Sequence, residues 1–489
     1  MNKTSLIIGA GYSGLAAASV LAHEGWHVTV VEKNSQCGGR AQVHRDQGFL
    51  FDMGPSWYLM PPAFEHLFSR LNENPQDHYD LVRLNPSYRI FNQQGPVDIV
   101  PDLEQNAEIF NRLEQNGYQK VLRYLERAEE QYNTSVESFL YRDYESVFDL
   151  LSPGFLIKGL KLGLFRSAGQ LAKKDFENDL IRKIMGYTMV FIGGSPDNTP
   201  GMYSLMSYID LRQNVWYPMG GMNKPASAME KLARNSGAEF LYNTPAEEIL
   251  VDSGKAVGVR TPSGEIRADV VISNADYHHT ETDLLKPEQR SYPEKYWKKR
   301  TVAPSAFIIY MGLDKKLDQL LHHNLYFHGN WSEHFETIFD QPRWPDKFSY
   351  YVCCPSRTDP SVAPEGQENL FFLVPVAAGL NDTDQIRQSF YTKVVDHFEQ
   401  LIGETIKPHI ITQRIFTHRD FIDSYHSWKG SAFNLAHTLF QTAVFRPSHS
   451  SKKVKNLYFT GQYTHPGVGI PMTLISAEVL ADRIQKEHG

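Results

Sequence analysis

The sequence predicts an α/β fold that contains a Rossmann-type dinucleotide-binding domain, and three observations near the N-terminus support this prediction. The apolar run Ser5-Leu6-Ile7-Ile8 has the character of a buried parallel strand. A glycine-rich turn follows it and leads into a helix-forming run that begins at Leu15. A second apolar run, His27 to Val31, ends at the acidic Glu32. This order of strand, turn, helix and strand is a βαβ unit.

The turn has the spacing GxGxxG, in which Gly9 permits a tight turn and Gly11 lets the backbone approach a pyrophosphate. Gly14 lets the helix pack closely on the strand. The first residues of that helix, Tyr12 and Ser13, present free N–H groups to negative charge. Glu32 lies 18 residues beyond Gly14, where its carboxylate can accept hydrogen bonds from ribose hydroxyls. The alternative is a structural βαβ unit with an incidental acid.

The residues after Glu32 favour FAD over NAD as the dinucleotide. Lys33 follows the acid directly, and Gly38-Gly39-Arg40 offers a second close approach to phosphate with Arg40 as charge partner. The segment from Asp52 to Trp57 forms a turn that can place backbone N–H groups near a flavin, so Ser56 and Trp57 are candidate contacts. By composition alone the same segment is equally an ordinary loop.

The composition excludes several classes of protein. A chain of 489 residues is too long for one hydrophobic core, so two or three subdomains are expected. A net charge of -7 argues against general nucleic-acid binding. Three cysteines are too few for a disulfide framework and none has a metal-ligand spacing, which fits a reducing, cytoplasmic compartment. No apolar stretch reaches the ~20 residues of a membrane-spanning helix.

The C-terminal region carries a second group of motifs. The segment Leu457 to Gly461 has the pattern of a strand that ends at a glycine. The motif His465 to Met472 follows and leads into a helix from Thr473 to Ile484. Pro471 suits the first turn of that helix, whose free N–H groups can face a flavin or its phosphate.

Together, these motifs resemble those of the flavin amine oxidase and carotenoid desaturase superfamily. The opening pattern of glycine fingerprint, acid, Gly-Gly-Arg and D-x-G-P turn is typical of the superfamily. The C-terminal motif is similar to that of bacterial carotenoid desaturases of the phytoene desaturase type, and the chain looks closest to the hydroxycarotenoid 3,4-desaturases. Four further blocks occur in the family's order: 191–196, 216–222, 273–276 and 430–433.

The resemblance implies a glutathione reductase-like FAD-binding domain, a mixed-sheet substrate domain and a helical, membrane-contacting insertion. The implied FAD-binding domain comprises residues 1–75, 220–290 and 454–489. The implied substrate domain comprises residues 76–99 and 291–453, and the insertion comprises residues 100–219. Within the FAD domain, the sequence itself indicates a helix from Pro225 to Asn235, and Glu265 to Ile272 as a single strand after a turn at Ser263-Gly264.

The implied activity is FAD-dependent 3,4-desaturation of a 1-hydroxy acyclic or monocyclic carotenoid, with quinone or oxygen as electron acceptor. Such a reaction removes a hydride and a proton from adjacent carbons, and the cofactor performs the difficult step. The family pattern places a proposed acid at Asp149, although Ser152 stands where a cation is expected. Further implied flavin contacts are Ala246 or Glu247 on the adenine side, Asn274, Ala275, Gly461, Gln462, Gly469, Ile470 and Met472.

Residues 155–166 mix bulky apolar side chains with cations and contain no acid, so they can lie in a bilayer interface. The sequence alone fits an amphipathic helix on the core equally well. Because a carotenoid resides in the membrane, we predict peripheral association with the inner face of the cell membrane.

Three alternative functions remain open at this stage, namely phytoene or diapophytoene desaturation, amine oxidation, and a non-enzymatic prenyl-lipid escort. Amine oxidation would require an aromatic cage, and an escort would not need the complete FAD fingerprint. The pairs His278-His279 and His322-His323 invite a metal site, but no ligand spacing completes one. We therefore expect surface histidines and no metal.

Overall fold

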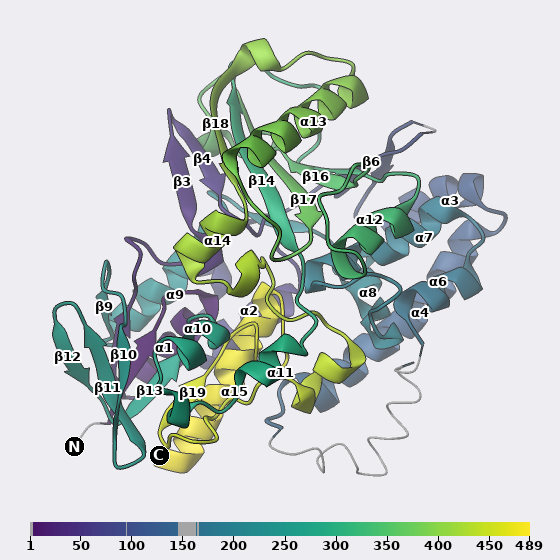
Figure 1. Cartoon of the computed structure of the whole chain (residues 1–489). Coiled ribbons are helices and arrows are strands. Elements are labelled where there is room, and N and C mark those ends of the chain that lie inside the picture. Colours follow the sequence, from purple (N-terminus) through teal and green to yellow (C-terminus); the bar gives the residue numbers. More distant parts are fainter. Residues whose placement is uncertain (1–2, 94, 145–162, 164–165) are drawn as a thin grey trace.

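The computed structural model describes residues 3–93, 95–144, 163 and 166–489. A five-stranded parallel sheet lies at the N-terminal side, with strand order β19-β13-β1-β2-β9 (Figure 1). Its strands are β1 (Thr4–Ile8), β2 (His27–Val31), β9 (Glu239–Leu241), β13 (Val270–Ser273) and β19 (Leu457–Phe459). Three segments far apart in the sequence therefore build one sheet, and Figure 1 shows both chain termini beside it.

Helix α1 (Tyr12–His23) packs between α9 (Asn223–Asn235) and α15 (Ile470–His488). Its alanines, from Ala16 to Ala18, are completely buried, and small side chains permit this close approach of three helices. The predicted strands and helices of the βαβ unit are confirmed. The helix predicted from Pro225 begins two residues earlier, at Asn223.

The single strand predicted from Glu265 to Ile272 is wrong, because this segment forms two strands in two different sheets. The first, β12 (Gly264–Arg267), is antiparallel to β11 (Lys255–Thr261), which pairs with β10 (Glu248–Asp252). The second is β13 of the parallel sheet. Asp269 lies between them and accepts hydrogen bonds from the backbone N–H of Thr4, at 2.9 Å, and from its hydroxyl, at 2.8 Å. This contact fixes the break.

A seven-stranded mixed sheet forms the second layer, in the order β18-β14-β17-β16-β15-β6-β7. The strands predicted at 307–312 and 370–376 are two neighbouring strands of this sheet, β14 and β17, which run antiparallel. Helix α13 (Asp384–Ile402) lies over this sheet in Figure 1. The remaining strands are β6 (Tyr88–Phe91), β7 (Val97–Ile99), β14 (Ser305–Leu313), β15 (His323–Tyr326), β16 (Tyr350–Cys353), β17 (Glu368–Val376) and β18 (Ile410–Phe416).

The region from 100 to 219 is mainly helical where the structure describes it, and lies to the right in Figure 1. Its helices are α3 (Ala107–Leu113), α4 (Gly117–Ser135), α6 (Ala168–Asp175), α7 (Asp179–Gly186) and α8 (Leu205–Leu211). The other elements are the hairpin β3 (Val43–Asp46) and β4 (Phe49–Asp52), the pair β5 (Leu81–Arg83) and β8 (Trp216–Pro218), and the helices α2 (Pro61–Arg70), α10 (Tyr277–Thr282), α11 (Glu294–Lys298), α12 (Trp331–Phe339) and α14 (His418–Tyr425).

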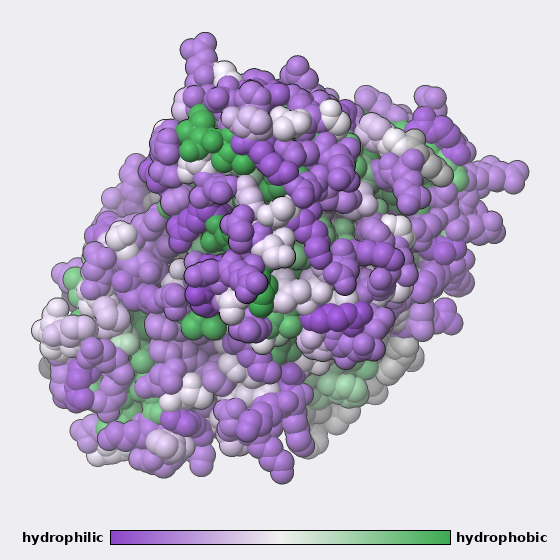
Figure 2. All heavy atoms as spheres, turned by 45° about the horizontal axis from the view of Figure 1, so that its top comes forward, coloured by the Kyte–Doolittle hydropathy of each residue, from purple (hydrophilic) through white to green (hydrophobic). Residues whose placement is uncertain are grey.

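Within the described residues, no helix has both the length and the apolar character needed to cross a bilayer. Figure 2 shows a largely hydrophilic face on which apolar side chains form small, separated patches. The large apolar surface of this protein is internal, in a cavity between the two sheets and the helical region.

Candidate functional site

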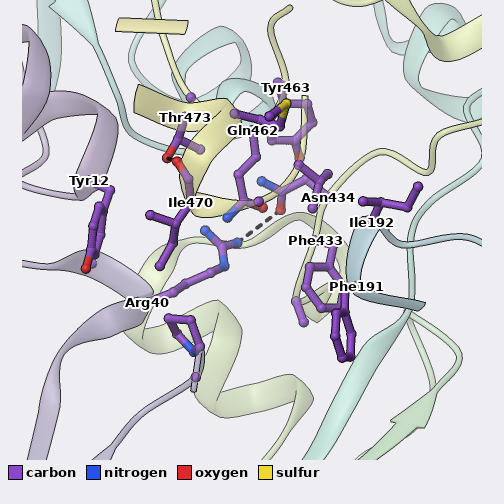
Figure 3. A pocket seen from close by; sticks show the side chains of 18 of the residues that line it. Tyr12, Arg40, Phe191, Ile192, Phe433, Asn434, Gln462, Tyr463, Ile470 and Thr473 are labelled. Carbon is purple, nitrogen blue, oxygen red and sulfur yellow. Dashed lines mark hydrogen bonds between the residues drawn. The ribbon is translucent and has the colours of Figure 1, made fainter. Parts of the chain in front are cut away.

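A cavity of about 540 Å³ extends from the glycine turn to the seven-stranded sheet and the helical region. Figure 3 shows residues of both chain ends and of the middle of the chain around it. Nineteen of the predicted cofactor contacts line this cavity: Gly9, Gly11, Tyr12, Ser13, Glu32, Lys33, Gly39, Arg40, Ser56, Trp57, Ala246, Asn274, Ala275, Gly461, Gln462, Gly469, Ile470, Pro471 and Met472. The structure therefore brings together residues that the sequence separates by more than 450 positions.

The glycine turn leaves no space for side chains at its critical positions. A Cβ atom on Gly14 would lie 2.1 Å from the carbonyl oxygen of Gly9, so Gly14 serves close packing and does not itself line the cavity. A Cβ on Gly39, whose φ is +57°, would lie 3.1 Å from the Cα of Gly11. The two glycine motifs therefore touch, and together they form a backbone cradle that suits a pyrophosphate.

Hydrogen bonds join the N-terminal helix to the C-terminal segment beside this cradle. The hydroxyl of Ser13 donates to the carbonyl of Thr473 at 2.8 Å and lies 2.6 Å from the hydroxyl of Thr460. The side-chain amide of Asn274 donates to the carbonyl of Gly9 at 3.3 Å. A Cβ atom on Gly461 would lie 3.0 Å from the amide oxygen of the same Asn274 side chain. Asn274 therefore links the two ends of the chain.

Glu32 is positioned at the end of β2, as the sequence predicted. Its carboxylate accepts hydrogen bonds from the backbone N–H groups of Ala10 and Asn34, each at 2.8 Å. Burial raises its pKa, while these two N–H groups oppose the shift. A carboxylate has about four acceptor positions, so two bonds fix its orientation and leave capacity for ribose hydroxyls.

Arg40 is held by neutral partners. Its Nη2 donates to the hydroxyl of Ser427 at 3.0 Å and to the amide oxygen of Asn434 at 3.0 Å, and Figure 3 shows the bond to Asn434. Its Nε is buried without a hydrogen-bond partner among the described residues. Burial lowers the pKa of this guanidinium, and the carboxylate of Asp276 opposes that shift. An anionic group in the cavity would satisfy Nε, so the residues present fit a dinucleotide phosphate.

Lys33 and the adenine-side pair differ from the prediction in detail. The ammonium of Lys33 donates to the carbonyl of Asp423, so it is directed towards the last turn of α14, while Lys33 also lines the cavity. Ala246 lines the cavity, whereas Glu247 does not. The backbone N–H of Glu247 instead donates to the carbonyl of Arg260, because it leads into the antiparallel ladder of β10 and β11.

Trp57 marks the apolar part of the cavity. Its indole stacks on the imidazole of His323, with centroids 4.1 Å apart and planes 6° apart, and it also contacts Phe191 at 5.2 Å. The hydroxyl of Ser56 lies 2.9 Å from that of Tyr351. Beyond Trp57 the wall is mostly apolar and includes Leu59, Met60, Val190, Ile192, Met206, Ile308, Leu325, Phe327, Leu373, Phe433 and Phe445.

The helix predicted from Thr473 to Ile484 is present, but it begins three residues earlier, inside the C-terminal motif, and ends at His488. Helix α15 begins at Ile470, with Pro471 in its first turn and Gly469 as N-cap residue at φ 110°. His465 is buried, its Nε2 lies 3.0 Å from the carbonyl oxygen of Phe139, and burial lowers its pKa to about 3. A neutral, hydrogen-bonded imidazole favours the loop-shaping role over titration near the cofactor.

The prediction of surface histidines is wrong for one pair. His322 and His323 are 4% and 0% exposed, because the mixed sheet and the Trp57 loop cover them. Their Nε2 atoms have no partner among the described residues, and both lie near the Cys353 thiol. Burial lowers the pKa of both imidazoles, to about 3 for His322, so they stay neutral at pH 7.

Two predicted features lie outside the described residues. Asp149, the proposed acid, is one of them. The other is the apolar and basic segment 155–166, of which the structure describes only Gly163 and Arg166.

The sequence did not identify Ser427, Asn434 and Asp276 as functional. Asp276 accepts hydrogen bonds from the Tyr463 hydroxyl at 3.0 Å and from the backbone N–H of Trp428 at 3.2 Å. It thereby connects the loop after α14, which contains the Arg40 partner Ser427, to the C-terminal loop. Each of these polar residues is buried. The only available signal was that Asp276 ends the family block 273–276, and that Ser427 and Asn434 lie shortly before and directly after the block 430–433.

The family model for flavin containing amine oxidoreductases matches residues 12–485. The chain belongs to this family. FAD is accordingly its cofactor, as the sequence predicted, and an FAD-dependent oxidoreductase is the class of enzyme.

Two similar proteins match this chain over almost its full length. A carotenoid 3,4-desaturase of Haloarcula japonica is 41% identical over 483 residues, covering 98% of this chain and 97% of its own. A zeta-carotene-forming phytoene desaturase of Myxococcus xanthus is 34% identical over 487 residues, covering 98% and 93%. Among solved structures, an oxidoreductase from Methanosarcina mazei aligns with a TM-score of 0.67 at 16% identity, covering 98% of this chain and all of its own, which indicates a shared fold.

Proposed function

We propose that this protein is an FAD-dependent carotenoid desaturase that introduces the 3,4 double bond of a 1-hydroxy acyclic or monocyclic carotenoid. The observation that carries the proposal is the continuity of the cavity, which joins a phosphate-binding cradle to a long apolar wall. A hydrocarbon chain fits such a wall, and a polar amine substrate would not require it. The relative of 41% identity, itself a carotenoid 3,4-desaturase, supports the choice of reaction.

The protein's own residues bind, orient and exclude water in this proposal. FAD, when bound, supplies the hydride acceptor. Arg40 and the Gly11 and Gly39 backbones hold the pyrophosphate, and Glu32 holds a ribose. Residues near Trp57 orient the polyene, and the apolar wall excludes water from the charge that develops on the chain. The division into a discontinuous FAD domain, a substrate domain and an insertion at the predicted boundaries belongs to this proposal.

The regiochemistry can be tested with purified, FAD-reconstituted protein. We expect a hydroxylated acyclic carotenoid in liposomes to gain one conjugated double bond, seen as a shift of absorption to longer wavelength and a loss of two mass units. Phytoene serves as the competing substrate. Turnover of phytoene alone would reassign the protein to phytoene desaturation, and a flavin-free, unreconstitutable protein would support the escort alternative.

Peripheral membrane binding through residues 155–166 is a further part of this proposal, because its substrate resides in a bilayer. Sedimentation with anionic liposomes tests it, with Leu160, Leu164 and Phe165 changed to Ser. Binding that persists in this triple variant would contradict it. Quinone and oxygen are the proposed electron acceptors, and anaerobic assays with and without added quinone distinguish them. Asp149 remains the proposed acid from the family pattern.

A further inference from the structure

Helix α8 buries a carboxyl group near the cavity without a cation. Asp210 is 3% exposed, and no lysine, arginine or histidine forms an ion pair with it in the described part of the chain. A buried carboxylate without a cation is costly, so such a group is normally protonated or serves a function.

Two tyrosines are the titratable groups that face this carboxyl. The hydroxyl of Tyr88 donates to Asp210 Oδ2 at 2.8 Å. The hydroxyl of Tyr187 also favours the ionised form of the carboxyl. However, neither this hydroxyl nor Asp210 Oδ1 forms a hydrogen bond of ordinary geometry with a described residue. One oxygen of the carboxyl is therefore fixed by Tyr88, and the other is free to act together with Tyr187.

Tyr187 connects this carboxyl to the cavity. It lines the cavity wall, as do Ile209, the residue before Asp210, and Trp57. Its ring centroid lies 6.1 Å from that of Trp57 and 5.5 Å from that of Phe191. Asp210 and Tyr88 do not line the cavity. The Tyr187 side chain therefore connects the cavity wall to the buried carboxyl, and its hydroxyl is itself buried.

The proposed reaction creates a requirement for such a group. After a hydride leaves the chain to the flavin, the neighbouring carbon must lose a proton inside a wall that is mostly apolar. Burial raises the pKa of Asp210 to about 7, and the two tyrosines partly oppose this shift. A carboxylate with that pKa is a suitable base at neutral pH.

We propose that Tyr187 and Asp210 form the proton acceptor of the desaturation, with Tyr187 as the catalytic residue and Asp210 as the positioning residue that receives the proton. This inference rests on the proposed function. In the step, the carbon–hydrogen bond breaks and its electron pair forms the new double bond. The proton joins the Tyr187 oxygen, while the hydroxyl proton of Tyr187 moves to Asp210. The step balances as one hydride, for which bound FAD would be the acceptor, and one proton, which ends on Asp210.

The variant Asp210→Asn tests the acceptor directly, because the amide oxygen can keep the bond from Tyr88 but cannot take up a proton. We expect kcat to fall about 100-fold to 10,000-fold. In the wild type, kcat should rise with pH through about 7 as Asp210 ionises. This rise, the limb of the pH profile near pH 7, should be absent from the variant. Tyr187→Phe should lower kcat by at least about 100-fold with little change in KM.

Two further variants separate catalysis from packing. Tyr88→Phe removes a hydrogen bond that lowers the pKa of Asp210, but it removes no hydroxyl from the cavity wall. The limb near pH 7 should therefore move to higher pH, while the variant stays active. Tyr217→Phe is the matched control, because its hydroxyl also donates to a buried carboxylate, Asp359, at 3.2 Å but does not line the cavity. We expect its pH profile to be that of the wild type.

An infrared titration gives a readout besides activity. The carbonyl stretch of a protonated, buried carboxyl should fade as the pH rises through about 7, and part of that signal should be missing in Asp210→Asn. The proposal is overturned if folded Asp210→Asn and Tyr187→Phe both keep kcat within threefold of the wild type with the limb intact. A wild type that desaturates no carotenoid would instead overturn the proposed function.

Discussion

In the part of the chain that the structure describes, Arg40 forms no ion pair with an acidic side chain, and its hydrogen-bond partners Ser427 and Asn434 are neutral. Its positive charge is therefore available to a ligand, and its unpartnered Nε adds a donor. A guanidinium held in this way is oriented before the ligand arrives, so less side-chain entropy is lost on binding.

We therefore expect Arg40→Leu to weaken FAD binding by about 10-fold to 100-fold, the loss of charge-assisted hydrogen bonds worth roughly 1.5–3 kcal/mol. Titration of apoprotein by flavin fluorescence measures this. Arg260→Leu is the control, because Arg260 pairs with Glu248 on the surface. Equal affinities of the Arg40 variant and the wild type would contradict the role of Arg40.

Glu281 gives a pH prediction that does not involve the cavity. It is fully buried, its Oε2 accepts from the backbone N–H of Tyr292 at 2.9 Å, and burial raises its pKa to about 7. Between pH 4.5 and 7 the folded protein holds a proton that the unfolded chain has lost. Stability must therefore fall as the pH rises through this window, by about 3 kcal/mol.

In Glu281→Gln this contribution should disappear. Denaturant unfolding at pH 5 and pH 8 should show a smaller loss of stability for the variant than for the wild type. Glu288→Gln, in an exposed turn, is the control. Parallel pH curves for the wild type and Glu281→Gln would contradict the assignment.

At this scale the sequence predicted the glycines well, because a turn with positive φ and no space for a Cβ is a local property. Arg40 was predicted as a charge, but its partners lie 387 and 394 residues away and leave no local trace. The burial of His322 and His323 was missed for the same reason. Their cover comes from Trp57, which lies far away in the sequence.

At the scale of elements, α1 is the centre of the cofactor domain. It contacts α9 on one side and α15 on the other, and Ser13 bonds across to the C-terminal segment. The periodic and capping patterns predicted these helices closely. The break between β12 and β13 was not predictable, because it depends on the contact of Asp269 with Thr4, 265 residues away.

Ser13→Ala should lower the free energy of unfolding by about 1–3 kcal/mol, because it removes a buried hydrogen bond to the Thr473 carbonyl and one of the two hydroxyl partners of Thr460, which keeps Ser476. Chemical denaturation followed by circular dichroism measures the change. The matched control is Ser227→Ala, an exposed helical serine on α9 that should change stability by less than about 0.5 kcal/mol. Similar losses in both variants would argue against a special role for Ser13.

At the scale of the whole molecule, the proposed FAD site combines segments from both ends and from the middle of the chain. Ligand that binds only the folded state stabilises it by mass action, by about 2.7 kcal/mol at 100 times Kd. We expect removal of FAD to lower the melting temperature by an amount that corresponds to this lost stabilisation. Adding FAD back should restore the melting temperature. A melting temperature independent of FAD concentration would contradict a bridging cofactor.

The position of β19 at the edge of the parallel sheet, next to β13, has a consequence for biosynthesis. Gly9 and Gly11 of the cradle leave the ribosome before residues 461–473, which form the opposite wall, because about 450 residues separate the two segments. The nascent protein must therefore be translated through residue 473 before both walls can hold the cofactor. A frameshift or nonsense mutation at Gly461 would remove this wall and would yield a colourless, flavin-free polypeptide.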